Sequence, residues 1–135
     1  MELTAKHLGD SRFEIVARGH RVISDQPYEN GGADSGMSPP EFLLASLAAC
    51  AGHYCAQYLK ARGLNAEDLQ VKVSAEKGER PARLASFRIE VTAPALDDHH
   101  RAALLRAARS CLIHNTLLTQ PGVEIIVTSA TPLAA

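Results

Sequence analysis

The sequence predicts an α+β domain in which antiparallel hairpins surround one long apolar helix. Two observations carry this prediction. Adjacent segments in both halves of the chain alternate apolar and polar side chains with a period of two, and short turns join them. Between these hairpins, residues 38–63 are apolar nearly all round and carry the start and stop signals of a helix. The resulting order, βββ-α-ββ-α-β, favours antiparallel sheets, and we expect a single domain over residues 1–135.

The amino-terminal part of the chain is predicted to form three short strands. Leu3–Leu8 and Arg12–Ala17 are joined as a tight hairpin by the Gly-Asp pair between them. A Gly-His turn then leads to a third strand, Arg21–Ser24. Residues 26–37 contain three glycines and form a loop that leads to the long helix.

The long helix has a clear beginning and end. Ser38 caps its first turn, Pro39 suits the first helical position, and Glu41 stands where a capping box has its acid. Gly63 ends it, because glycine adopts the left-handed conformation readily. Such an apolar helix is buried on most sides, yet at 1.5 Å per residue it is roughly 36 Å long, about the diameter of the domain. We therefore expect a homodimer, in which a second subunit covers the helix.

Two longer strands follow the helix. Leu69–Glu76 and Ser86–Ala93 each place apolar side chains on one face and polar side chains on the other. The segment Lys77–Arg83 is predicted to be the turn between them, and Pro94 closes the second strand.

A second helix and a last strand complete the prediction. Asp97 or Asp98 caps the helix, and Gly122–Thr128 returns as a strand before a tail at Ser129–Ala135. The helix has its arginines on the side that faces water. Its apolar stripe comprises Leu104, Leu105, Ala108, Cys111 and Leu112.

Composition excludes several classes of function. With 14 basic and 15 acidic residues the net charge is −1, so no nucleic-acid or acidic-membrane surface is indicated. Aromatic residues make up 4% of the chain and tryptophan is lacking, which argues against a stacking platform for single strands. The apolar run 42–51 is too short to span a bilayer, and the polar amino end is unlike a signal peptide. Three cysteines without a secretion signal favour reduced thiols and a cytoplasmic location.

Cysteine and histidine are the residues of this chain that point to chemistry. Cys50 lies in the middle of the long helix and Cys111 on the stripe of the second, and each is followed three residues later by a histidine, His53 and His114. Taken singly, a cysteine on an apolar stripe usually behaves as a small hydrophobic residue. Cys55 points about 140° away from Cys50 around the helix, so we interpret it as structural.

The sequence around both cysteines resembles that of a known family. The runs S-P-P-E-F-L-L-A-S-L-A-A-C (Ser38–Cys50) and R-S-C-L-I-H-N-T-L (Arg109–Leu117) are similar to the OsmC/Ohr superfamily, the osmotically inducible and organic hydroperoxide resistance proteins. The segment Gly19–Pro27 also resembles the family's approach to its central helix. The resemblance implies the OsmC-like fold, an intertwined homodimer with long central helices enclosed by antiparallel sheets.

The resemblance also implies a reaction and its residues. Cys50 corresponds to the thiol that attacks an organic hydroperoxide and Cys111 to the thiol that resolves the product as a disulfide, which a dithiol reductant then restores. No cofactor is implied. The family takes the cation that activates the first thiol from the amino-terminal strands, where Arg12, Arg18 and Arg21 stand, and Arg12 is the best positional match.

The chain departs from the peroxidase branch of this family in two places. The family's catalytic acid stands ten residues before the first cysteine, where this chain has Pro40, and Glu41 stands nine residues before Cys50. One residue rotates a helix by about 100°, and capping explains Glu41 without catalysis, so a catalytic role for Glu41 stays open. The proline that follows the family's resolving cysteine is Leu112 here.

Two other functions remain open from the sequence. Cys50 with His53 and Cys111 with His114 form two C-x-x-H pairs whose ligands suit zinc. The displaced acid also fits a non-catalytic member of the family that binds a small apolar ligand.

Overall fold

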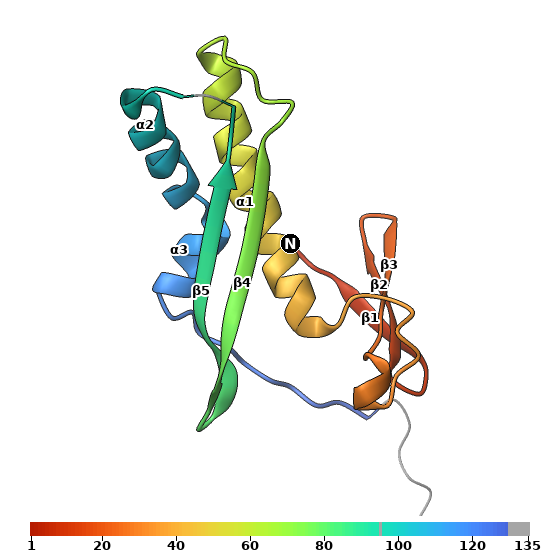
Figure 1. Cartoon of the computed structure of the whole chain (residues 1–135). Coiled ribbons are helices and arrows are strands. Elements are labelled where there is room, and N and C mark those ends of the chain that lie inside the picture. Colours follow the sequence, from red (N-terminus) through yellow and green to blue (C-terminus); the bar gives the residue numbers. More distant parts are fainter. Residues whose placement is uncertain (95, 130–135) are drawn as a thin grey trace, which may run out of the picture.

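The computed structural model describes residues 1–94 and 96–129, which form a small amino-terminal sheet and a larger body of helices and one long hairpin (Figure 1). The order of elements confirms the α+β class with antiparallel sheets. Among these residues, no helix is both long enough and apolar enough to cross a membrane.

The amino-terminal sheet has three antiparallel strands in the order β1-β2-β3. They span Thr4–Gly9, Arg12–Ala17 and His20–Ser24, within one residue of the predicted bounds. Asp10 and Arg18 both have φ of 50°, because each of the two tight turns that join the strands needs a left-handed residue beside its glycine. A short 3-10 turn, η1 (Tyr28–Asn30), lies in the loop that follows.

Helix α1 (Pro39–Ala61) has the predicted cap. The Glu41 carboxylate accepts hydrogen bonds from the backbone N–H and the hydroxyl of Ser38, both at 2.7 Å, which is the arrangement of a capping box. At the other end Gly63 has φ of 67° and the N–H of Leu64 donates to the carbonyl of Leu59 at 2.9 Å. Local sequence signals therefore define both ends of this helix.

The long hairpin pairs β4 (Gln70–Glu79) with β5 (Ala82–Thr92). The predicted turn over Lys77–Arg83 is wrong, because the ladder continues through these residues after a register shift and pairs Glu79 with Ala82. The alternation of side chains is as predicted. Apolar side chains of both strands face α1.

The second helical region consists of two helices. The helix α2 (Asp98–Arg109) is capped by Asp97, which accepts from the N–H of His100 at 2.7 Å, and α3 (Leu112–Leu118) begins after Cys111. The prediction of one continuous helix whose apolar stripe includes Cys111 and Leu112 is therefore wrong. The chain leaves the helix at Ser110, whose hydroxyl donates to the Arg106 carbonyl at 3.1 Å. As a result Leu105 and Leu112, two members of the predicted stripe, are 54% and 58% exposed.

The predicted last strand, Gly122–Thr128, is not formed within this chain. The segment is extended but pairs with no strand among the described residues, and its apolar side chains lie open, with Ile125 and Val127 85% and 92% exposed (Figure 1). A strand needs a partner for its backbone groups, and residues 1–94 and 96–129 offer none at that place. Of the predicted tail, all residues beyond Ser129 lie outside the described part.

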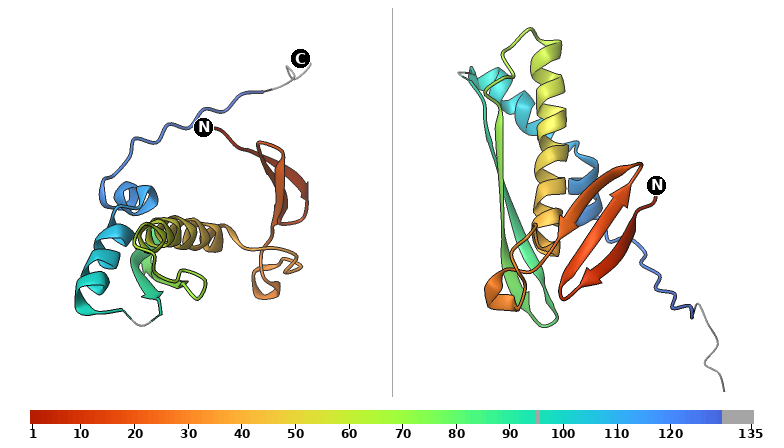
Figure 2. Two further views of the ribbon diagram at one scale, coloured as in Figure 1. Left: turned by 90° about the horizontal axis from the view of Figure 1, so that it is seen from above. Right: turned by 90° about the vertical axis from the view of Figure 1, so that its right-hand side faces the viewer.

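The core lies along one side of α1. Leu47, Ala51, Cys55 and Leu59, spaced four residues apart, are buried against β4, β5, α2 and α3. The rest of the helix is only partly covered, so burial on most sides is not achieved within one chain. Viewed along α1, the amino-terminal sheet stands opposite α2, and the loop before α1 joins it to the body (Figure 2).

Candidate thiol site

The fold brings Cys50 and Cys111 together. Cys50 lies half-buried on α1, and Cys111 is fully buried at the start of α3, where both belong to one apolar cluster with Leu47 and Ala51. The break at Ser110 makes this possible, because it lets α3 turn back and pack against α1. Cys50 packs against the cluster that contains Cys111, and the two thiols shift each other's pKa.

The surroundings of Cys50 favour its thiolate. Burial by itself would raise the pKa of Cys50, but hydrogen bonds from the Cys111 thiol and from the backbone N–H groups of Ile113 and Leu112 outweigh burial and lower it. Three donors thus converge on one sulfur. A lowered thiol pKa marks a nucleophilic cysteine, since the thiolate is the reactive form.

Cys111 has the opposite character. Burial and the hydrogen bond that it donates to Cys50 raise the pKa of Cys111, although the N–H of His114 contacts its sulfur at 3.4 Å. Cys50 therefore loses its proton first, and Cys111 keeps the proton that stabilises the neighbouring thiolate. The pair has the division of labour that an attacking thiol and a resolving thiol need.

The third cysteine faces the core. Cys55 is fully buried, its sulfur lies 3.9 Å from the Leu104 carbonyl oxygen, and burial raises the pKa of its thiol. This thiol has the inert environment of a structural cysteine.

Glu41 lies at the exposed start of α1. Nine helical residues separate Glu41 from Cys50, about 13 Å along the helix axis. Its carboxylate binds Ser38, whose hydroxyl and backbone N–H lower the pKa of Glu41. Within this chain the residue acts as a cap.

The candidate arginines all lie on the amino-terminal sheet. Arg21 pairs with Glu14 at 2.8 Å, whereas neither Arg12 nor Arg18 forms an ion pair with a residue in the described ranges. None of the three contributes to the pKa shift of Cys50. One chain alone therefore unites Cys50 and Cys111 but leaves the arginines on a separate sheet.

The histidines near the two cysteines do not form a metal centre. His53 is exposed and lies edge-on to the Tyr54 ring at 5.7 Å, while His114 uses its backbone N–H toward Cys111. Residues 1–94 and 96–129 contain no group of three or more His, Cys, Asp or Glu side chains that could hold a metal. The zinc interpretation gains no support.

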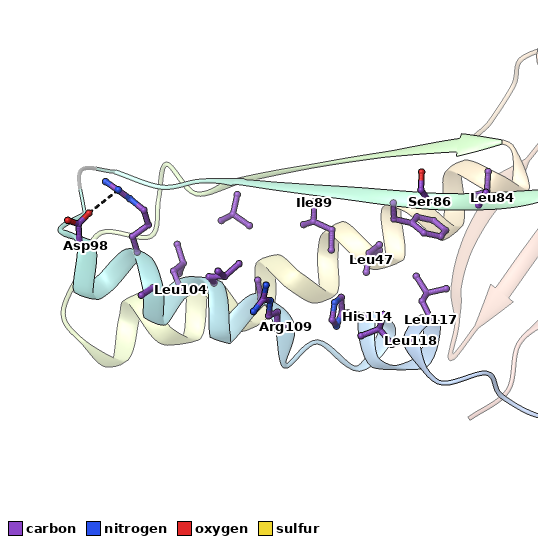
Figure 3. Close-up of a pocket in the computed structure, with 17 residues that line it drawn as sticks. Leu47, Leu84, Ser86, Ile89, Asp98, Leu104, Arg109, His114, Leu117 and Leu118 are labelled. Atoms are coloured by element: carbon purple, nitrogen blue, oxygen red, sulfur yellow. Dashed lines mark hydrogen bonds and ion pairs between the residues drawn. The ribbon is translucent and has the colours of Figure 1, made fainter. Parts of the chain in front are cut away.

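An apolar groove that the sequence did not predict lies next to this site. It has a volume of about 890 Å³ and is bounded by β5, α2 and α3, with Leu47 at its floor (Figure 3). Arg109 and His114 lie along the helical side, and Cys50 is not among the lining residues.

The comparison with family models identifies one family, and the comparison with solved structures identifies one fold. A family model described as OsmC-like protein matches residues 31–127. No curated protein is significantly similar to the chain. Among solved structures, an OsmC-like protein from Mycoplasma pneumoniae is 21% identical, with a TM-score of 0.73, and the match covers 88% of this chain and 87% of that one.

Two other solved structures extend this likeness. A proposed osmotic stress induced and detoxification response protein from Psychrobacter arcticus 273-4 is 21% identical, with a TM-score of 0.78 over 84% of this chain and 85% of that chain. The organic hydroperoxide resistance protein OhrB of Bacillus subtilis is 23% identical, with a TM-score of 0.55 over 88% and 90%. At these identities the likeness shows the fold.

Proposed function

The chain belongs to the OsmC-like protein family, and we propose that it is a cysteine-dependent peroxidase that reduces organic hydroperoxides. Similar folds that are named for hydroperoxide resistance support a role in redox chemistry or peroxide resistance. The observation that carries the finer proposal is the contact between Cys50 and Cys111, whose pKa values are shifted in opposite directions.

The reaction balances in three steps. The Cys50 thiolate attacks one oxygen of the hydroperoxide, the O–O bond breaks, and the alkoxide takes up a proton and leaves as an alcohol, so that Cys50 becomes a sulfenic acid. The Cys111 thiol attacks the sulfenic sulfur, an S–S bond forms, and hydroxide leaves with the thiol proton as water. A dithiol reductant then supplies two electrons and two protons and is itself oxidised to a disulfide. Such a cycle belongs in a reducing compartment, which supports a cytoplasmic location.

The working unit in this proposal is an intertwined homodimer. The support is the apolar surface that one chain leaves open, which includes one side of α1 and the unpaired segment 122–128. A second copy would cover α1 and give the segment a strand to pair with, in an interface above about 2,000 Å². It would also place the amino-terminal sheet of one subunit over the thiol site of the other.

This arrangement gives Arg12 a role. In the proposal its guanidinium stands near the Cys50 thiolate of the other subunit and stabilises it further, in addition to the hydrogen bonds within the chain. Arg12 is suited to this because it forms no ion pair among the described residues.

A titration with cumene hydroperoxide tests the function. One equivalent should form one disulfide between Cys50 and Cys111, detected by peptide mapping, while Cys55 stays reduced. With a dithiol present the peroxide should be consumed continuously. Recovery of all three thiols unmodified would overturn the proposal.

The groove supports a second candidate, a non-catalytic protein that binds a small apolar ligand. Binding of an uncharged fluorescent probe in the groove, by a protein that consumes no hydroperoxide, would favour this candidate over the peroxidase.

A further inference from the structure

Asp25 is the one buried carboxylate among the described residues, and the thiol chemistry does not use it. It follows β3 directly and is 1% exposed. Its carboxylate accepts five hydrogen bonds, and these lower the pKa of Asp25 far below its usual range, with the Ser11 hydroxyl the largest cause. The donors are Ser11 Oγ at 2.6 Å, Ser35 Oγ at 2.7 Å, and the backbone N–H groups of Gln26 at 2.8 Å, Ser35 at 3.1 Å and Ala33 at 3.2 Å.

These donors belong to two segments that are otherwise separate. Ser11 lies in the turn between β1 and β2, whereas Ala33 and Ser35 lie in the loop that leads to α1. The loop itself is folded closely upon β3. A Cβ atom on Gly32 would lie 1.8 Å from the Gln26 carbonyl oxygen, and one on Gly36 would lie 2.2 Å from the Ile23 carbonyl oxygen, so neither position admits a side chain.

The bond to Ser11 bears directly on Arg12, its neighbour in the chain. The ladder of β2 and β3 ends with the pair Phe13 and Ser24, and Arg12 and Asp25 are the next residues on the two sides of that pair. An aspartate at that place would ordinarily pair with the arginine. Here the Asp25 carboxylate oxygens accept hydrogen bonds from hydroxyl and backbone donors, and no ion pair joins Asp25 to Arg12 in the described part of the chain. The guanidinium charge is thereby left for another partner.

We propose that Asp25 is a positioning residue for the thiol site: by holding Ser11 it fixes the turn that presents Arg12 to the thiolate. This inference rests on the proposed function, in which Arg12 activates Cys50. Fixing the backbone that carries a catalytic side chain before the reaction is a recognised source of rate, because it limits the positions that the side chain can take.

The test compares Asp25→Asn with Asp97→Asn. Both variants lose a carboxylate that accepts backbone hydrogen bonds, but Asp97 caps α2, away from the amino-terminal sheet. The measurement is the rate of alkylation of Cys50 by iodoacetamide as a function of pH, followed at that residue by peptide mapping at a temperature where each variant is folded. We expect Asp25→Asn to move the midpoint of this profile toward the ordinary thiol value of about 8.5, and Asp97→Asn to leave the midpoint in place.

Arg12→Ala and the double variant with Asp25→Asn complete a double-mutant cycle. If Asp25 acts through Arg12, Arg12→Ala shifts the midpoint in the same direction, and the double variant shifts it no further than Arg12→Ala does alone. A midpoint that Asp25→Asn leaves unchanged, or two shifts that add in full, would overturn the proposal. Should Asp25→Asn not fold, Ser11→Ala removes only the hydrogen bond from the Ser11 hydroxyl to Asp25, and the same outcomes apply to that variant.

The alkylation profile separates this inference from the proposed function. A wild-type protein that consumes no hydroperoxide, but whose midpoint moves in both variants, would refute the peroxidase and keep the role of Asp25. If the wild-type protein consumes peroxide steadily and both variants have the wild-type midpoint of Cys50 alkylation, the peroxidase is kept and the role of Asp25 is refuted.

Discussion

The two antiparallel sheets of this chain have the same local design and opposite surroundings. The β4–β5 hairpin lies against α1, and its inward side chains form the core with the helices. The β1–β3 sheet is built from equally clear hairpins, yet no helix of the described chain packs on it, and Phe13 and Val22 are partly open to solvent (Figures 1 and 2).

This difference shows that strand formation and strand burial have separate causes. Alternation and turn chemistry act over a few residues, and they produce both sheets. Burial needs a partner surface. For β4–β5 that surface is α1, whereas no helix among the described residues provides such a surface for the amino-terminal sheet. In the proposed function the thiols lie in one region and their charged partner, Arg12, in the other, and the following experiments test that proposal.

The largest effect is expected for Cys50→Ser, which should abolish turnover of organic hydroperoxide. The hydroxyl that replaces the thiolate is not ionised at neutral pH and cannot form a sulfenic acid. Cys111→Ser should differ, since Cys50 then reacts once and stops at the sulfenic or sulfinic acid. Whole-protein mass spectrometry after one equivalent of peroxide distinguishes these outcomes. Cys55→Ala serves as the control and should retain turnover, and if its activity vanished while the fold stayed intact, our interpretation of that thiol would fail.

The next effect concerns Arg12. Arg12→Ala should lower the second-order rate constant for peroxide by about tenfold or more, because a cation beside the thiolate is removed. If the arginine of one subunit serves the cysteine of the other, the impaired variant Arg12→Ala and the inactive variant Cys50→Ser should rescue each other. After unfolding and refolding a 1:1 mixture of Arg12→Ala and Cys50→Ser, half of the dimers carry one complete site, and about a quarter of the wild-type activity should return.

The control for this mixture is the double variant, in which both changes lie on one chain, mixed with wild type. If the site is shared between subunits, mixed dimers in this mixture contain no complete site, so only the wild-type dimers, about a quarter of the total, are active. Comparison with wild-type protein refolded alone reports any loss during refolding. A mixture of the single variants that stays inactive, with dimers present, would show that each subunit completes its own site.

A third effect concerns the segment 122–128. Ile125→Asp should weaken the dimer by about 100-fold or more, because a carboxylate would be buried in an apolar interface. Gln120→Asp, an exposed position just after α3, is the matched control and should leave the dimer intact. Sedimentation velocity at micromolar concentration measures both against the 14.5 kDa mass of one chain. Wild-type protein that sediments as a folded monomer would contradict the proposed assembly.

The sequence was sufficient for those elements whose signals are local. Both ends of α1 and the three amino-terminal strands were predicted because each depends on neighbouring residues, and the cap of α2 was narrowed to Asp97 or Asp98, of which the structure has Asp97. The contact of Cys50 with Cys111 came from the family resemblance. Composition and periodicity alone left both residues as plausible core cysteines.

The remaining differences arise from interactions that periodicity does not describe. The chain leaves α2 at Ser110, so the apolar stripe is divided between α2 and α3, and an apolar groove lies beside these two helices. The hairpin continued through Glu79 because backbone pairing outweighed turn-forming residues. Asp25 gave no signal at all, since its role depends on donors that lie 14 residues before it and up to 10 after it.

The smallest effect should come from Glu41. Glu41 is an exposed cap, and hydrogen bonds from Ser38 lower its pKa, so folding stabilises the charged form of the Glu41 carboxylate. Its contribution is therefore present at neutral pH, above the unfolded value of about 4.3, and is lost as the pH falls through the lower folded value. Glu41→Ala should reduce the unfolding temperature at pH 7 by a few degrees, about 2–5 °C, and this difference from wild type should shrink in acid.

The activity of the same variant decides between capping and catalysis. The loss of a general acid typically costs about 10²–10⁴-fold in rate, so a cap that takes no part in the chemistry should leave peroxide consumption within about threefold of wild type. Glu41→Gln is the matched variant, because glutamine keeps a capping-box acceptor without the charge. If both variants stay folded and lose activity by more than a hundredfold, Glu41 is the catalytic acid despite its displaced position. If both stay active, the start of α1 serves the fold, and the chemistry rests on the thiols and the amino-terminal sheet.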